Sequence, residues 1–182
     1  MLLVLVAGTA VAQDSSFSRL RIRGSVVRLP VIGHIGDDWR AQTGAQLEIG
    51  SNVGNGELSL AAARIAFEPT TGKPRFTETV FSLSWLRPVA ATPRGELAVG
   101  GRLSDVRMDF DDPALVAGLR TEEEVLLAVV ARGRLSVGRG FGAFLEMAAG
   151  ALMLSTRTPT VSVAAGLEHG LSSPSWLRDF LR

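Results

Sequence analysis

Residues 97–104 have the sequence Leu-Ala-Val-Gly-Gly-Arg-Leu-Ser, in which two kinds of side chain alternate. One set of alternate positions is apolar apart from a glycine, and holds Leu97, Val99, Gly101 and Leu103. The other set is small or charged, and holds Ala98, Gly100, Arg102 and Ser104. Because successive side chains of a β-strand point to opposite faces, this pattern predicts a strand with one apolar face.

The same alternation recurs along most of the chain, in segments separated by turn-forming residues. It predicts eight strands, at approximately 18–29, 43–51, 57–67, 76–86, 96–108, 125–137, 141–154 and 161–171. A strand that crosses a bilayer needs about 9–11 residues, whereas strands of soluble proteins usually have about 5–6. The segment lengths therefore favour a membrane barrel. Segment 57–67 changes its apolar face midway, which we attribute to a β-bulge near Ala63 and Arg64.

Length and composition exclude several classes of protein. The chain has 182 residues, enough for one domain, and a net charge of +1 gives no general attraction to nucleic acid. It has no cysteine, so disulfides and thiolate chemistry are excluded. No apolar run reaches the roughly 20 residues of a transmembrane helix. Contact with a membrane core would therefore require a closed barrel.

The two ends of the chain differ from the alternating region. Leu2–Val6 is apolar, and Ala10-Val11-Ala12 fits the small-x-small rule for signal cleavage. We therefore predict a signal peptide at 1–12, a β-barrel domain at 13–171 and a C-terminal amphipathic tail at 172–182. The tail would lie either at a membrane interface or against a soluble core.

Alternation alone does not decide which face is inside. A soluble barrel turns its apolar face inward, and a membrane barrel turns it outward. The polar face here is mostly Gly, Ala and Ser with a few charges, which suits a narrow eight-stranded lumen. Charges of both signs occur on it, and charges in a dry lumen need such partners. The predicted lumen charge network comprises Arg19, Arg21, Arg23, Glu48, Arg102, Arg132, Arg134, Glu146 and Glu168.

The connections alternate in length. Those expected to be long are 30–42, 68–75 and 109–124, and those expected to be short are 52–56 and 138–140. Asn55-Gly56 is a strong hairpin signal. Arg87–Gly95 is longer than a regular alternation of long and short connections requires, and 155–160 is shorter. Long external loops and short periplasmic turns are typical of membrane barrels.

These features together resemble the small eight-stranded outer-membrane barrels of the OmpA type. The resemblance is architectural and covers nearly the whole mature chain. It implies export to the outer membrane, contact with outer-membrane lipid and lipopolysaccharide, and a protein partner bound through 30–42 and 109–124; we expect a monomer. Members of this kind are tethers, adhesins, stress-resistance factors or, in a minority, lipid-modifying enzymes. Two departures are the absence of tyrosine and of a C-terminal strand ending in Phe.

Two alternatives to this interpretation remain. Thr121-Glu122-Glu123-Glu124 resembles a capping box, and 121–132 and 141–154 contain many helix formers, so that both could be helices of a soluble α+β protein. Gly133 and the glycines of 138–142 oppose long helices. The functional alternatives are a soluble exported, lipocalin-like binding module and a barrel enzyme that modifies envelope lipid.

Candidate catalytic and metal-binding residues are few, and we predict no catalytic, cofactor or metal site. His34 with Asp37 and Asp38 could contribute to a metal site, but such a cluster is more often a solvated turn. A hydrolase would need His169 beside a serine, with Ser136 and Ser162 the conceivable partners, and nothing in the spacing requires either. Glu168 and His169, as strand neighbours, are expected on opposite faces.

The third long connection combines charge with an apolar stretch. Its flanks are acidic, with Asp105, Asp109, Asp111, Asp112, Glu122, Glu123 and Glu124. They could bind cations that bridge lipopolysaccharide phosphates, although a solvated external loop is the favoured interpretation. Pro113–Leu119, between the flanks, could contact a partner or fold over the barrel mouth.

Overall fold

Eight long antiparallel strands make up the molecule in a computed structural model that describes residues 16–29, 38–70, 72–112, 118, 120–153 and 158–176. Their bounds are β1 (Arg19–Arg28), β3 (Gly44–Val53), β4 (Gly56–Pro69), β5 (Phe76–Ala91), β6 (Gly95–Phe110), β7 (Thr121–Gly138), β8 (Phe141–Leu152) and β9 (Pro159–Ser172). Each predicted segment corresponds to one of these strands. Thr121–Glu124 begins β7 and caps no helix, so the helical interpretation of 121–132 and 141–154 is wrong.

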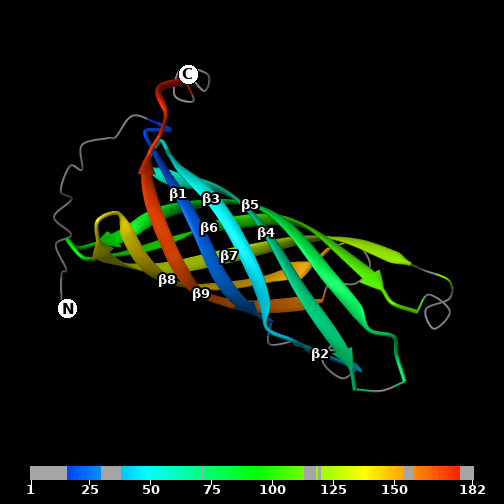
Figure 1. Ribbon diagram of the computed structural model, residues 1–182. Helices are drawn as coiled ribbons and strands as arrows, with labels where there is room; N and C mark the ends of the chain where they lie inside the picture. Colours follow the sequence, from blue (N-terminus) through cyan, green and yellow to red (C-terminus); the bar gives the residue numbers. More distant parts are fainter. Residues whose placement is uncertain are drawn as a thin grey trace, which may run out of the picture.

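The strands form a closed barrel in which sequence neighbours pair in space (Figure 1). β1 pairs with β3 on one side and with β9 on the other, and the pairing of β4 with β5 completes the ring. Every pairing in the ring is antiparallel and joins consecutive barrel strands, except that the first, β1, pairs with the last, β9; this is the up-and-down arrangement. The all-β, eight-stranded barrel expected from the alternation is confirmed.

One further strand was not predicted. β2 (Trp39–Ala41) pairs with the end of β4, where Trp39 lies opposite Pro69 and Ala41 opposite Phe67. It belongs to the connection expected at 30–42, of which residues 30–37 lie outside the described residues. Three residues are too few for alternation to be recognised in a sequence.

The turns at one end of the barrel are short. Gly54 and Asn55 form the β3–β4 hairpin loop, one residue earlier than the expected Asn55-Gly56 pair, and Gly54 takes the positive φ of 58°. Arg139 and Gly140 form the β7–β8 turn, both with positive φ. β5 and β6 extend so far that only Thr92–Arg94 separates them, so the long connection predicted at 87–95 is wrong. The strand continues through Pro88 by means of an irregularity at Pro88/Ala90.

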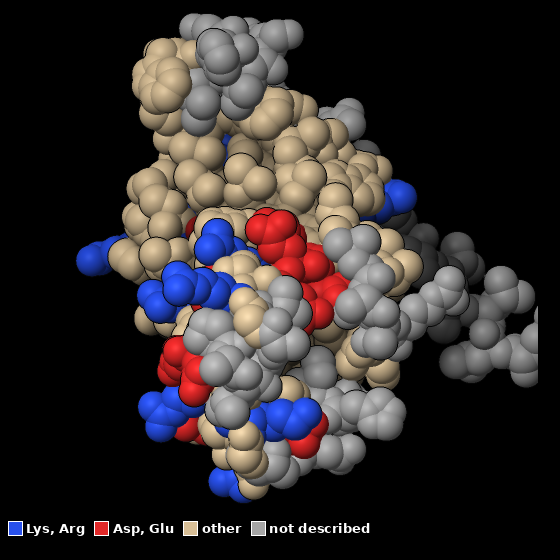
Figure 2. All heavy atoms as spheres, turned by 90° about the vertical axis from the view of Figure 1, so that its right-hand side faces the viewer, with Lys and Arg blue, Asp and Glu red and all other residues tan. Residues whose placement is uncertain are grey.

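We call this the short-turn end; β1 starts and β9 finishes there. The opposite, long-loop end carries the β1–β3, β4–β5, β6–β7 and β8–β9 connections, to the right and below in Figure 1. The charged residues at 105, 109 and 122–124 belong to strands, because the β6–β7 connection comprises only 111–120. Charged side chains gather over much of this end, as Figure 2 shows.

The apolar face of the strands points outward. Leu47 and Val129 are each 70 % exposed, and comparable outward residues occur on every barrel strand. They include Ile22, Leu60, Phe81, Leu83, Leu97, Leu103, Leu127, Leu135, Leu145, Met147 and Leu167. We call this surface the apolar band. A lipocalin-like interior lined by the same residues is therefore not present.

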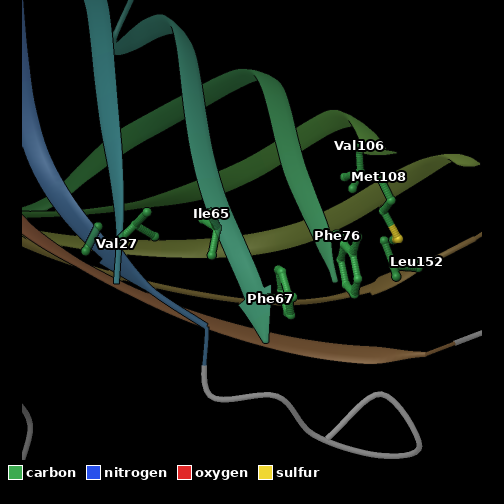
Figure 3. Close-up of a cluster of buried hydrophobic side chains, with 8 residues drawn as sticks. Val27, Ile65, Phe67, Phe76, Val106, Met108 and Leu152 are labelled. Atoms are coloured by element: carbon green, nitrogen blue, oxygen red, sulfur yellow. The ribbon is translucent and has the colours of Figure 1, made fainter. Parts of the chain in front are cut away.

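The larger of two buried apolar clusters lies inside the barrel toward the long-loop end (Figure 3), and the smaller one holds Leu86, Ala98, Val130 and Ala148. The larger cluster comprises Val27, Ile65, Phe67, Phe76, Val106, Met108, Leu152 and Ala164, and we call it the apolar plug. Phe76 stacks on Phe67 with ring centroids 4.3 Å apart, and Trp39 meets it edge-on at 5.6 Å. β4 contributes Ile65 and Phe67 without any shift of register against β3 or β5, so the predicted bulge near Ala63 and Arg64 is wrong.

The predicted signal peptide at 1–12 lies outside the described residues. Of the predicted tail at 172–182, Ser175 and Trp176 are helical, and 177–182 also lie outside. Among the described residues, no helix has both the length and the apolar character needed to cross a membrane.

Candidate functional site

The middle of the lumen is filled by ion pairs, and Glu57 is shared by four arginines. Glu57 is the second residue of β4, and its side chain points into the barrel. Its carboxylate accepts from Arg21, and from Arg23 at 2.6 Å, Arg132 at 3.3 Å and Arg134 at 3.4 Å. These arginines come from β1 and β7, so one carboxylate links strands on different sides of the barrel.

Arg23 and Arg132 are the most buried arginines of this network, with side chains 1 % exposed. Arg23 donates to Glu48 at 2.6 Å and to Glu168 at 2.9 Å. Arg132 donates to Glu48 at 2.7 Å and to Glu146 at 2.5 Å. Because each guanidinium has several donors in a fixed plane, it can satisfy two or three carboxylates at once, as buried charges require.

Two further arginines complete the network. Arg102 donates to Ser84 and ion-pairs with Glu146, both at 2.8 Å. Arg134 ion-pairs with Glu96 at 2.8 Å, in addition to its contact with Glu57. Five arginines and five glutamates thus form one connected group, comprising Arg21, Arg23, Arg102, Arg132 and Arg134 with Glu48, Glu57, Glu96, Glu146 and Glu168.

Small and aromatic residues make room for these charges. A Cβ on Gly50 would lie 2.9 Å from the Glu57 carboxylate and 3.1 Å from the Arg23 guanidinium, so only glycine leaves that space free. Phe144 is buried, and the guanidinium carbons of Arg23 and Arg132 lie 5.9 and 5.6 Å from its ring centroid. Both distances allow a cation–π contribution.

Of the nine residues proposed from the sequence for the lumen, eight lie in this group: Arg21, Arg23, Arg102, Arg132, Arg134, Glu48, Glu146 and Glu168. Arg19 is exposed at the short-turn end. Sequence reasoning missed Glu57 and Glu96. Each precedes an outward leucine, Leu58 or Leu97, and successive side chains of a strand point to opposite faces. This alternation indicates that both glutamates point into the lumen.

Two buried acids lie beside the plug. Glu78 of β5 lies between Ile65 and Met108 in the sheet register, and Glu124 of β7 lies opposite Val106 and is 1 % exposed. Glu78 differs from Glu124 in its contacts. No hydrogen bond or ion pair involves its side chain among the described residues. Burial raises the pKa of Glu78 to about 7, because the charged carboxylate loses its hydration there. The outward neighbours of Glu78 on β5 are Thr77 and Thr79, so it lies beyond the apolar band, which begins at Phe81.

The outer surface of the barrel changes from apolar to polar at the height of Glu78. A row of polar residues crosses four adjacent strands in register: Arg64, Thr79, Arg107 and Glu123. We call these four residues the polar rim. Toward the short-turn end the outward residues form the apolar band, although the exposed Asp105 lies in register with Phe81 at its edge. On the loop side the outward residues include Asp109, which accepts from Arg107 at 3.1 Å. The barrel is therefore apolar outside and charged inside in its middle, but polar outside and apolar inside near the loops.

The candidate catalytic and metal-binding residues are not brought together. His169 pairs in register with Phe141 and Ile22 of the apolar band, and its ring centroid lies 4.2 Å from that of Phe141. Glu168 points inward to Arg23, so the expected opposition of Glu168 and His169 is confirmed. Ser136 and Ser162 occupy inward positions of their strands, by parity with Arg134 and Glu168, and thus face away from His169.

His34 and Asp37 lie outside the described residues, and Asp38 is 3.5 Å from Lys73. In the part of the chain that the structure describes, no group of three His, Cys, Asp or Glu residues could hold a metal ion.

The closed ring of eight antiparallel strands, with its outward apolar band, is the fold of the small outer-membrane barrels. No protein-family model matches the sequence, and no curated protein matches it significantly.

Three solved structures show the likeness in fold. The N-terminal β-barrel domain of Pseudomonas aeruginosa OprF matches with a TM-score of 0.56 and 10 % identity, over 86 % of this chain and 99 % of that one. Neisserial surface protein A matches with a TM-score of 0.56 and 10 % identity, over 83 % and 95 % of the two chains. Ail, the attachment invasion locus protein of Yersinia pestis, in complex with the heparin analogue sucrose octasulfate, matches with a TM-score of 0.54 and 12 % identity, over 84 % and 97 %.

Proposed function

We propose that this chain is a non-enzymatic outer-membrane barrel with a closed lumen, whose long-loop end has a structural or surface-interaction role. The observation that carries the proposal is the apolar band. A monomer in water would expose these residues at a high cost, at about 25 cal/mol for each Å² of apolar surface, whereas lipid removes that cost. The ten charged residues of the lumen network can be buried because each has an opposite charge beside it.

The asymmetry of the connections supports an orientation. Membrane barrels place short turns on the periplasmic side and longer loops outside. The short-turn end would then face the periplasm, and β2, the polar rim and the long connections would face outward. Arg64 and Arg107 of the polar rim would lie at the level of lipopolysaccharide phosphates, which guanidinium groups bind well. A protein partner would be bound through 30–42 and 109–124.

The packing of the lumen supports a closed barrel. The ten-residue charge network occupies its middle, and the apolar plug occupies the part toward the loops. An eight-stranded barrel is only just wide enough for its own side chains. A role in the passage of solutes is therefore disfavoured, and interaction at the outer surface is favoured. Two of the structural neighbours are by title a surface protein and an attachment protein.

Envelope fractionation with heat modifiability tests the proposal. Membrane fractions from cells that express the full chain are separated on SDS gels with and without boiling. A band in the outer-membrane fraction that migrates faster without boiling is the expected result, since a closed barrel resists detergent until heated. A periplasmic band whose mobility is unaffected by boiling would contradict the proposal.

A further inference from the structure

The outer wall of the barrel contains an apolar groove to which the proposed function gives no role. Its volume is about 760 Å³, and it crosses β1, β3, β4, β5 and β6 to reach β7. Ala62 lies between Leu47 and Phe81 in the sheet register, and its small side chain helps to leave the wall hollow there. Among the described residues that line the groove, Asp105 is the one charged residue that points outward, because Glu48 points into the lumen.

The groove is inclined to the barrel axis, because rows of paired residues climb across the barrel. The row that starts at Glu48 of β3 passes through β4, β5 and β6 and reaches β7 at Leu126. Across the lumen, however, Glu48 ion-pairs at 2.7 Å with Arg132 of β7, which lies nearer the short-turn end than Leu126 does. Rows therefore rise toward the long-loop end from β3 to β7. Asp105 consequently lies at the end of the groove nearest the loops, and Ile22 lies deeper in the apolar band.

The carboxylate of Asp105 has no counter-ion at this place. Its side chain makes no hydrogen bond or ion pair with any described residue. Arg107, the next outward residue of β6, donates to Asp109 on its other side at 3.1 Å, so its guanidinium is directed away from Asp105. The neighbours of Asp105 in the register are Phe81 and Val125, both apolar. A carboxylate beside hydrocarbon is costly unless a cation pairs with it, so the groove favours an occupant that supplies a cation.

The other outward charges around Asp105 favour the same sign of ligand. Asp109 follows on β6 and Glu123 lies beside Arg107 on β7, whereas Arg107 and Arg64 are the neighbouring basic residues. Acidic residues, with Asp105, therefore exceed basic residues by one. This surface should attract a cationic headgroup and repel one with a net negative charge.

We propose that the groove binds a lipid whose headgroup carries a primary ammonium group. The ammonium donates to Asp105, and one hydrocarbon chain follows the groove to Ile22. Four inter-strand spacings of about 4.8 Å separate β6 from β1, which gives the chain a path of roughly 19 Å. A second barrel would present a convex wall and leave the groove unfilled, whereas a single flexible chain fills it. The proposal rests on the proposed function, because only a membrane-embedded barrel turns this groove toward lipid.

Native mass spectrometry of the refolded full chain in detergent tests the proposal. The probes are phosphatidylethanolamine and phosphatidylglycerol with identical acyl chains, because they differ only in the headgroup. We expect phosphatidylethanolamine to bind about tenfold more tightly, as one hydrogen bond to a charged group would give. Equal binding of the two lipids, or tighter binding of phosphatidylglycerol, would overturn the proposal.

Two variants of equal charge change test the role of Asp105. Asp105→Asn should remove the preference for phosphatidylethanolamine, because the ammonium loses its ionic partner. Glu123→Gln removes an exposed carboxylate of the polar rim that does not line the groove, and should keep the preference. A preference retained in Asp105→Asn, or lost equally in both variants, would overturn the assignment of Asp105.

A second pair of variants tests the groove itself. Ala62→Phe should weaken the binding of both lipids, because the ring occupies the path of the chain. Ala149→Phe adds the same ring at an exposed position of β8 outside the groove and should bind as the unaltered chain does. Unchanged binding in Ala62→Phe would show that the lipids bind elsewhere. Each protein is checked for heat-modifiable mobility. A folded barrel without lipid preference would overturn this inference alone, whereas an unaltered chain without that mobility would overturn the proposed function as well.

Discussion

The guanidinium of Arg23 and the carboxylate of Glu57 lie 2.6 Å apart in the middle of the lumen, on strands that are not hydrogen-bonded neighbours. β3 lies between β1 and β4 in the sheet, so the pair spans it from inside. The contact therefore joins two strands that no backbone hydrogen bonds connect. Because Glu57 also pairs with three other arginines, its loss would affect more partners than the loss of any other residue of the network.

Glu57→Ala should lower the free energy of unfolding by about 3–5 kcal/mol, because it leaves four arginines short of an anion in a buried site. Urea unfolding of the refolded barrel in detergent measures the change. Glu68→Ala is the matched control, since Glu68 and Arg75 form an exposed pair at 2.9 Å that should contribute about 0–1 kcal/mol. Equal losses in the two variants would show that the network has no special role in stability.

Truncation of apolar residues should depend on the face they occupy. Ile65→Ala should cost about 2–5 kcal/mol and Phe67→Ala about 3–5 kcal/mol, because each leaves a cavity in the plug. Leu97→Ala and Leu135→Ala should cost only about 0.5 kcal/mol each in lipid vesicles, where lipid fills the space. Unfolding measured in vesicles separates the two groups. The opposite order would mean that the apolar band forms a protein core.

A charge introduced on the outer surface should be costly only within the apolar band. Val129→Arg should destabilise the barrel in vesicles by about 2–4 kcal/mol, the usual cost near a bilayer midplane. Ala66→Arg lies on the loop side of Arg64, beyond the band, and should change stability by less than about 1 kcal/mol. Similar effects at both positions would contradict the proposed depth of the membrane.

Glu78 should make stability depend on pH. Its pKa is about 7 in the folded chain, compared with an ordinary value of 4.5. The folded state therefore holds a proton that the unfolded state releases, and stability should fall as pH rises from about 4.5 to 7. Glu78→Gln should remove this slope and, above pH 7, be the more stable protein by about 3 kcal/mol. If the unfolding free energies of the unaltered chain and of Glu78→Gln changed in parallel with pH, ionisation of Glu78 would not destabilise the folded chain.

The closed lumen should conduct poorly. In planar bilayers the refolded chain should give no resolved single-channel steps, because charged pairs and the plug occupy the interior in series. Recordings are made alongside a preparation of a known porin, which establishes that the bilayers report open channels. Regular steps from this chain would indicate a continuous water path past Phe76 and Arg132.

The sequence was sufficient to predict the eight strands, because period-two alternation is typical of a β-strand with one apolar face. Their outward apolar face followed from the length of the strands and from the small residues and oppositely signed charges of the polar face. The sequence was not sufficient to predict the level along the barrel at which the outer surface passes from lipid to water. Along β4 the apolar residues pass from Leu60, outside, to Ile65, inside, and we interpreted that change as a bulge. The register of β4 with its neighbours is continuous. What changes along the strand is the environment outside the barrel, from lipid to water.

The charge network was predicted only partly for a different reason. Its pairs join residues as far apart as Arg23 and Glu168, 145 positions along the chain, and no local pattern specifies such a pairing. Alternation predicts that a side chain points into the lumen, but it does not specify the height of that side chain along the barrel axis. The shared role of Glu57 required the stagger of β4 against β1 and β7, which only the assembled barrel supplies.

The polar rim also bears on how the barrel enters a membrane. If the chain inserts from the periplasmic side, Arg64, Arg107 and Glu123 must be carried through the hydrocarbon layer before they reach water again. Each ionised group opposes that transfer. Spontaneous insertion should be slow and should quicken in thinned or defective bilayers. Once these groups have reached water on the far side, their return into the hydrocarbon layer would carry the same free-energy cost. The polar rim therefore makes insertion directional and nearly irreversible.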